Sequence, residues 1–277
     1  MEKKNVIMDM GFEGLLQLGY KELHYELITW IVANYDIGYH RLCMQTKVVV
    51  PVTPKDVREV LGISDNGVDI LIYNRHGTPN RTYDIQILED NMRDLPIGEE
   101  FKKSFLIFAC ATILAPNSKQ KGMHDLWDTI WDSDVGVRKN WAKFVLQYVE
   151  DGIRDYRNSH QTYIKGCVLF LQVLRSHPLH INVICIFRIN FFCCWSSNSF
   201  SNSLIFASHS IAFLYDQNMT SVQVEVCSPL GVAWIDDQIK RRLAAEIQTY
   251  GKYGHVQVWS SYSINVDWFY HYFMFQT

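Results

Sequence analysis

Residues 101–115 read FKKSFLIFACATILA, and this stretch decides the fold class. After Ser104 its apolar side chains cover nearly every side of a helix, which is typical of a helix at the centre of a protein core. The segment is too short to cross a bilayer, which takes about 20 residues. Pro116-Asn117 ends it. We therefore expect a helical protein built around this segment.

Amphipathic segments on both sides of the central helix are its expected packing partners. Each carries apolar residues at helical spacing with charged residues on the other side. These segments span residues 20–35, 122–135, 139–153 and 160–174. Together they predict several helices that share one aromatic-rich core.

A short helix and a small β element are predicted between the first two amphipathic segments. Thr53 can cap a helix, Pro54 suits its first position, and Asp56 favours its positive start. Gly62 is a typical helix end. Before this helix, residues 41–50 carry β-branched side chains toward their end, which favours a strand or a short hairpin. After it, residues 62–97 predict an irregular excursion.

Composition limits the class of protein. The chain has 277 residues, of which 48% are apolar, 14% aromatic and 20% charged, and these values exclude a disordered, collagen-like or low-complexity chain. The net charge is −3, so no global basic field attracts nucleic acid or anionic membrane. The start of the chain contains no signal-peptide pattern, so we expect an intracellular protein, with its seven cysteines as free, buried thiols.

The charge pattern changes abruptly near residue 175. Residues 1–175 carry 21 Lys/Arg and 23 Asp/Glu, whereas residues 176–224 carry only Arg188 and Asp216. Three interpretations stay open for this unpatterned apolar stretch: a membrane segment within 181–215, which Arg188 interrupts, a buried hairpin, or translation of an unspliced intron. The third fits Gln172-Val173, which a splice-donor sequence can encode. Gln257-Val258 begins a similar stretch, 258–277.

A regular spacing of apolar residues resumes between these two stretches. Ile235, Ile239, Leu243 and Ile247 recur in steps of four and predict an amphipathic helix over residues 234–250. We expect its basic run, residues 240–242, on a solvated face. The expected organisation is a helical domain over 8–174, an unpatterned insert over 175–224, a helical continuation over 225–257, and a non-native tail over 258–277.

Catalytic and metal-binding patterns lead to no predicted site. No nucleotide-binding, serine-hydrolase or zinc-protease motif occurs. Two half-sites for zinc, His40–Cys43 and His177–His180, have no convincing second pair. The run from Asp132 to Gly136 begins like a calcium loop, but its twelfth position is Lys143 in place of a glutamate. We therefore predict no metal, and we expect the acidic residues around 125–134 to form a solvated helix face.

Cys167 is the remaining nucleophile candidate, because Gln161 precedes it at a spacing used by one class of cysteine protease. Cys167 lies in an apolar helical run, and an activated thiol needs an exposed, electropositive helix start. We therefore predict no catalytic, cofactor-binding or metal-binding residue and no cofactor.

A set of motifs resembles one plant family. The set comprises MGFEGLLQL (10–18), LITWIVANYD (27–36), PVTPKDVREVLGI (51–63), FKKSFLIFACATILAPN (101–117), KNWAKFVLQYV (139–149) and IKGCVLFLQV (164–173). It resembles the helical region that precedes ubiquitin-like-protein-specific cysteine protease domains in plant transposon-encoded proteins, and it is similar to the aminotransferase-like plant mobile domain. The resemblance covers roughly 8–173, and residues 234–258 look like its continuation.

The resemblance implies an intracellular, transposon-derived protein of a kind that includes nuclear proteins, rather than a chemical activity. The protease domain of that family would bring a His, an Asp and an Asp-Cys-Gly nucleophile, a pattern that this sequence lacks. We expect a non-catalytic interaction or scaffold domain with an unknown protein partner and without nucleic-acid or membrane binding. The alternative is an accessory N-terminal region of a peptidase encoded by a longer gene product.

Overall fold

The computed structural model describes residues 2–19, 22–45, 47–72, 84–116, 124–159, 163–176 and 229–254. In these residues the protein is mainly helical, with one small three-stranded antiparallel sheet, which confirms the predicted fold class. The insert predicted over 175–224 lies outside the described residues except for its first two positions, and the tail over 258–277 lies wholly outside them.

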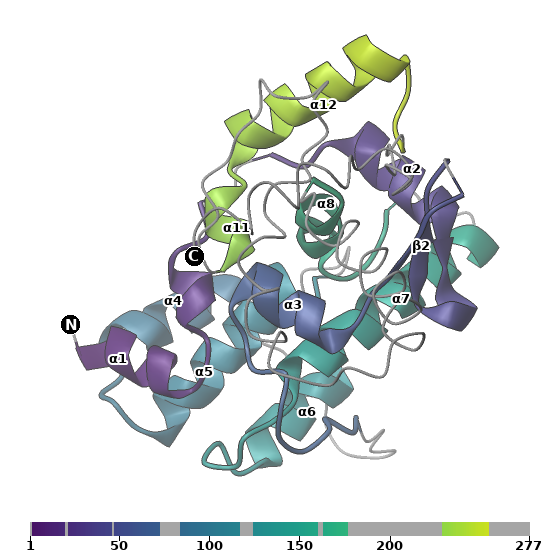
Figure 1. Ribbon diagram of the computed structural model, residues 1–277. Helices are drawn as coiled ribbons and strands as arrows, with labels where there is room; N and C mark the ends of the chain where they lie inside the picture. The colour runs from purple at the N-terminus through teal and green to yellow at the C-terminus, as the bar shows by residue number, and fades with distance from the viewer. Residues whose placement is uncertain are drawn as a thin grey trace, which may run out of the picture.

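The predicted central helix is α5 (Glu99–Ala109), which continues into a π-helical turn, η3 (Cys110–Leu114). Phe101 and Ile107 of α5 are almost fully buried, as the apolar run predicts. Two helices pack along α5: α4 (Ile85–Asp94) and α6 (His124–Asp132). Beside them, α1 (Glu2–Asp9) and the short 3-10 turn η1 (Glu13–Leu16) complete this side of the molecule (Figure 1).

Helix α4 corrects the prediction of an irregular excursion over residues 62–97. Leu88 is the one buried side chain of α4 among those described, and the rest of the helix is largely polar. This composition explains why the sequence did not indicate a buried helix here. The Asp84 side chain accepts a hydrogen bond from the Gln86 N–H and so caps the helix start. Contact with α5 stabilises this short, largely polar helix.

The second group of helices surrounds the long α7 (Trp141–Ser159). Against α7 lies α3 (Pro54–Leu61), which also packs on α8 (Val168–Ser176), and α8 in turn packs on α2 (Tyr25–Asn34). Helix α3 begins and ends as predicted. The Thr53 N–H donates to Asp56 at 2.6 Å within a capping box, and Gly62 ends the helix with a φ of 63°.

Helix α8 starts later than the predicted residue 160. Just before it, Gly166 adopts a φ of 96°, and a Cβ there would lie 2.8 Å from the Val149 Cα on α7. A left-handed conformation at this close approach suits only glycine, and the chain becomes helical only after it, from Val168.

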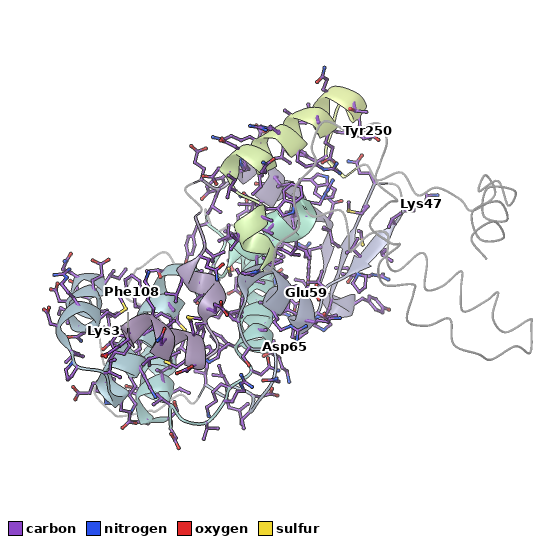
Figure 2. All side chains as sticks on the ribbon, turned by 60° about the vertical axis from the view of Figure 1, so that its left-hand side comes forward. Lys3, Lys47, Glu59, Asp65, Phe108 and Tyr250 are labelled. Carbon is purple, nitrogen blue, oxygen red and sulfur yellow. The ribbon has the colours of Figure 1, made fainter. Side chains whose placement is uncertain are left out.

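The predicted β element is a sheet of three short strands, β1 (Tyr35–Asp36), β2 (Arg41–Cys43) and β3 (Val49–Pro51), in the order β1-β2-β3. A 3-10 turn, η2 (Ile37–Tyr39), joins the first two strands. Leu42 is paired with Val50, and both side chains are buried. Lys47, in the turn between β2 and β3, lies at the far end of the hairpin, away from the helices (Figure 2).

Residues 229–254 return to the same core. They form α11 (Leu230–Ala233), packed on α3 and α8, and α12 (Asp236–Tyr250), packed on α8 (Figure 1). Trp234 is 1% exposed, and a Cβ on Gly231 would lie 2.6 Å from the Val60 carbonyl oxygen. The folded unit therefore includes chain on both sides of residues 177–228.

The inward face of α12 differs from the predicted stripe. Ile239 and Leu243 are buried, but Ile235 and Ile247 are 43% and 41% exposed. Arg242, expected on the solvated face, is buried. The reason lies on α8, where the buried Arg175 bonds Glu246 and so turns the Glu246 face of α12 inward.

Candidate functional site

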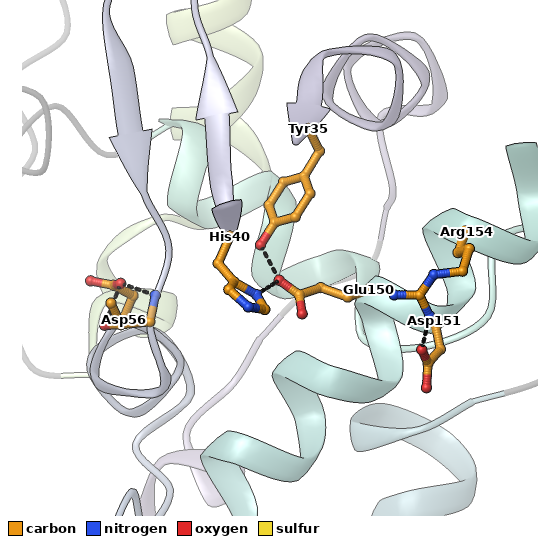
Figure 3. Close-up of polar contacts among 7 residues, drawn as sticks. Tyr35, His40, Asp56, Glu150, Asp151 and Arg154 are labelled. Carbon is orange, nitrogen blue, oxygen red and sulfur yellow. Dashed lines mark hydrogen bonds and ion pairs between the residues drawn. The ribbon is translucent and has the colours of Figure 1, made fainter. Parts of the chain in front are cut away.

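One polar cluster joins the sheet to α7 and presents three side chains to the solvent. We call it the hairpin site: Tyr39, His40 and Arg41 form its surface, and Tyr35 and Glu150 lie beneath them. Figure 3 shows the Tyr35 and His40 side chains converging on Glu150.

Glu150 is a buried carboxylate that forms hydrogen bonds with two other side chains. It is 4% exposed, and its Oε1 accepts the Tyr35 hydroxyl at 2.6 Å and bonds the His40 Nδ1 at 2.8 Å. Burial, reinforced by the hydrogen bond to Glu150, raises the pKa of Tyr35, so the phenol stays protonated and donates. A carboxylate acceptor also requires a proton on the His40 Nδ1.

His40 is held in a rare backbone conformation. Its φ of 48° and ψ of 57° lie in the left-handed region, which few residues other than glycine adopt. Its carbonyl oxygen accepts the Val52 N–H at 2.7 Å, and its imidazole is fixed by Glu150. The His40 side chain nevertheless remains 59% exposed. Because Nδ1 is engaged, Nε2 is the ring nitrogen available to a partner.

The two neighbours of His40 form a second ordered pair. The Arg41 guanidinium lies 4.5 Å from the centre of the Tyr39 ring, a cation–π arrangement, and its Nε donates to Asp36 Oδ2 at 3.1 Å. Tyr39 is 72% exposed, the largest exposed fraction among the described large apolar side chains. An aromatic ring, a guanidinium and an imidazole are thus presented together in fixed positions.

The framework beneath the hairpin site comes from α7. Arg157 lies two turns after Glu150 and donates through Nη2 to the Tyr35 carbonyl oxygen at 2.6 Å. Its guanidinium also bonds the Val32 carbonyl, so it caps the last carbonyls of α2. One helix therefore anchors both the end of α2 and the histidine turn.

The other residues considered in the sequence do not join this site. Cys167 lies immediately before α8 rather than within a helix, and its carbonyl oxygen accepts the Phe170 N–H at 3.1 Å. The Phe170 backbone lowers the pKa of the Cys167 thiol. Burial has the larger effect and raises the pKa of Cys167 to about 12, so this thiol is not activated. Gln161, its proposed partner, lies outside the described residues.

The metal candidates stay apart in the described part of the chain. No group of three or more His, Cys, Asp or Glu side chains gathers there. His40 contacts Glu150, and His177–His180 lies outside the described residues. Asp134 accepts the Gly136 N–H at 2.7 Å in a local turn. The acidic face of α6 is not wholly solvated as predicted, because Asp128 is 7% exposed.

The described cysteines agree with the predicted free thiols. Cys43, Cys110 and Cys167 are unpaired, and the last two are buried. Within the described ranges, no helix combines the length and apolar character needed to cross a membrane. The stretch considered as a membrane segment, 181–215, is outside them.

Sequence reasoning missed the hairpin site, although a signal for it exists. His40 was noticed only as half of a zinc pair, and Glu150 not at all. Yet Glu150 follows Leu146 by four residues and precedes Ile153 by three, so it interrupts the apolar face of α7. A carboxylate on a buried helix face needs donors, which points to a polar partner in the fold.

Comparisons with known proteins place most of the chain in a family. Residues 1–172 match a family described as "Domain of unknown function (DUF8566)". Neither a curated protein nor a solved structure matches the chain.

Proposed function

Because the chain belongs to the DUF8566 family, whose description specifies no activity, we propose from the geometry that it is a non-catalytic interaction domain that binds a protein partner through the hairpin site. The observation that carries this proposal is the exposed Tyr39–His40–Arg41 surface, ordered by the buried Glu150.

The chemistry of the surface suits protein recognition. Tyrosine and arginine are enriched where single residues dominate the affinity of protein interfaces. Here they stack on each other, and Tyr39 is 72% exposed. The edge strand β3 beside them ends in Pro51, which lacks the N–H that strand addition would use. Recognition through side chains is therefore favoured over pairing of backbones.

Preorganisation supports the same proposal. Ordering a flexible side chain on binding costs about 0.5–1.5 kcal/mol, and much of that ordering is already in place here. Asp36 and Tyr39 hold Arg41, and Glu150 holds the His40 ring. The left-handed backbone at His40 persists because these contacts outweigh its strain.

An imidazole oriented by a buried carboxylate also occurs in acid–base catalysis. His40, however, is 59% exposed, whereas a catalytic base acts in a site that excludes water. The nucleophile candidate from the sequence, Cys167, keeps its proton because burial raises its pKa to about 12. These features favour binding over catalysis.

The origin and location of the protein form part of the proposal. The resemblance to plant transposon-derived regions supports a transposon-derived scaffold in the nucleus. The match to DUF8566 ends at residue 172, next to the change of sequence character at Gln172-Val173.

Affinity purification of the full chain from cells of its source organism tests the proposal. Tyr39→Ala and Arg41→Ala should each lower recovery of a specific partner at least about tenfold, the effect of a 1.4 kcal/mol loss. Tyr25→Ala is the matched control, because Tyr25 is an exposed tyrosine on α2, at 66%. Recovery that falls equally for Tyr25→Ala and Tyr39→Ala, or for neither, refutes the hairpin site as the interface.

A further inference from the structure

A second polar cluster lies where α12 packs on α8, with Trp30 of α2 beside it, remote in sequence from the hairpin site. We call it the α8–α12 junction: Arg175, Arg242 and Glu246, with Trp30 and Gly254 beside them. The Arg175 Nη2 donates to Glu246 Oε1, and the Gly254 N–H donates to the same oxygen at 2.8 Å. The Arg175 guanidinium also lies 5.5 Å from the centre of the Trp30 ring.

The junction buries more positive than negative charge. Arg175 is 4% exposed, Arg242 is 7% exposed and Glu246 is fully buried, so the described residues bury two guanidiniums and one carboxylate here. Burial lowers the pKa of Arg175, the Glu246 carboxylate raises it, and the positive charge of Arg242 lowers it again. Arg242 lies one helical turn before Glu246 on the buried face of α12, so it faces the same side as the Arg175–Glu246 pair. An uncompensated buried charge is strongly unfavourable, so this arrangement calls for a further anion.

The unsatisfied hydrogen-bonding atoms are concentrated at the same place. Four buried side-chain atoms in the described residues lack a hydrogen-bond partner: Arg175 Nε, Arg242 Nε, Glu246 Oε2 and His24 Nε2. The first three belong to the junction. His24 lies one turn away, where its backbone N–H donates to Gln172 of α8 at 2.7 Å. A buried polar atom without a hydrogen-bond partner destabilises the fold, so these atoms call for a ligand.

The unpaired atoms specify the kind of ligand. The two Nε–H groups need acceptors with negative charge, and Glu246 Oε2 needs a donor. Hydrogen phosphate offers both, because it carries anionic oxygens and a P–OH group. Sulfate supplies acceptors but has no proton near neutral pH. Arg242 and Glu246 are one helical turn apart, so one small tetrahedral ion can reach both.

We propose that the α8–α12 junction is a binding site for a protonated phosphate group, held between Arg175 and Arg242 with its hydroxyl donated to Glu246. Bound phosphate neutralises the excess charge and fastens α12 to the helices that precede residue 177.

Thermal unfolding of the full chain at pH 6.5 and constant ionic strength tests the proposal, with phosphate, methyl phosphate, sulfate and chloride compared. About 20 mM phosphate acting on a site with a dissociation constant of about 1 mM raises the ratio of folded to unfolded protein about 20-fold. That change corresponds to a rise in Tm of roughly 4–7 °C. A rise with phosphate alone identifies the free ion, and a rise with methyl phosphate as well identifies phosphate esters.

Two variants on adjacent positions of α12 locate the site. Arg242→Met removes the unpaired charge, so it should fold without phosphate and show no phosphate-dependent rise in Tm. Arg241→Met is the matched control, because Arg241 is exposed, and it should keep the full rise. Calorimetric titration of the wild-type chain with phosphate gives a readout independent of folding.

Three results would overturn the proposal: no titration signal with phosphate, an equal rise in Tm with sulfate, or an unchanged rise in Arg242→Met.

Discussion

Replacing Glu150 by glutamine tests whether the buried carboxylate holds the hairpin site together. The amide keeps the shape of the side chain and an acceptor oxygen, but it removes the charge. In the wild-type protein one oxygen accepts the Tyr35 hydroxyl at 2.6 Å and bonds the His40 Nδ1 at 2.8 Å. The substitution therefore converts two charge-assisted hydrogen bonds into neutral ones.

The size of the effect follows from these two bonds. A hydrogen bond to a charged group contributes about 1.5–3 kcal/mol and a neutral one about 0.5–1.5, so the Tyr35 bond should lose about 1 kcal/mol. The His40 bond should lose less, because the His40 side chain is 59% exposed and solvent screens it. We expect the free energy of unfolding to fall by about 1–1.5 kcal/mol, or Tm by roughly 2–6 °C.

Urea unfolding of the full chain, followed by tryptophan fluorescence, measures this change. The control is Asp151→Asn on the next residue, because Asp151 pairs with Arg154 at the surface and 53% of its side chain is exposed (Figure 3). We expect less than about 0.5 kcal/mol for the control. A double-mutant cycle of Glu150→Gln with Tyr35→Phe should give a coupling above about 0.5 kcal/mol. Equal effects of the two single variants, or zero coupling, would refute the reasoning.

Three other predictions concern the thiols and the packed glycines. At pH 8 in the folded protein, the partly exposed Cys43 should react with an alkylating reagent and Cys167 should not, because burial raises the pKa of Cys167 to about 12; equal labelling contradicts this. Above pH 9 the unfolded chain releases the Cys167 proton and the folded chain keeps it, so stability falls as pH rises towards 12. Between these pH values, Cys167→Ala should reduce the slope of the free energy of unfolding against pH by about 1.4 kcal/mol per pH unit. An unchanged slope contradicts the assignment of this pKa to Cys167. Gly152→Ala should destabilise by about 1–3 kcal/mol, because the added Cβ would lie 2.0 Å from the Lys165 carbonyl oxygen. The control is Gly98→Ala, because the nearest atom to its added Cβ would be 3.9 Å away. In thermal unfolding of both variants, the free energy of unfolding of Gly98→Ala should stay within about 0.5 kcal/mol of wild type.

Most of the helical architecture could be predicted from local pattern. The apolar run of α5, the capping residues of α3 and the β-branched hairpin act through neighbours in the chain, and such signals are legible in one sequence. Helix α4 is hard to predict because its composition is largely polar, with Leu88 as its one buried side chain among those described, and because it is stabilised by contact with α5. The late start of α8 depends on Gly166 touching Val149, a contact between distant segments.

The polar clusters could not be predicted for a related physical reason. Each depends on a charge that is buried only because residues far apart in sequence meet. Glu150 meets His40 across 110 positions, and Arg175 meets Glu246 across 71. A regular apolar stripe predicted Ile247 inward on α12, but Arg175 selects the face that carries Glu246. A charged residue within an apolar face is the one signal of such a meeting that the sequence contains.

Photo-crosslinking from the hairpin site tests the proposed function most directly. A photoreactive phenylalanine analogue at position 39, in the full chain expressed in cells of its source organism, should crosslink to one specific protein. The same analogue at position 25 should not, although Tyr25 is similarly exposed. Glu150→Gln should weaken the crosslink from position 39, because it loosens His40 beside the analogue. Crosslinks of equal yield from both positions, or none from position 39, would contradict the proposal that this surface binds a protein partner.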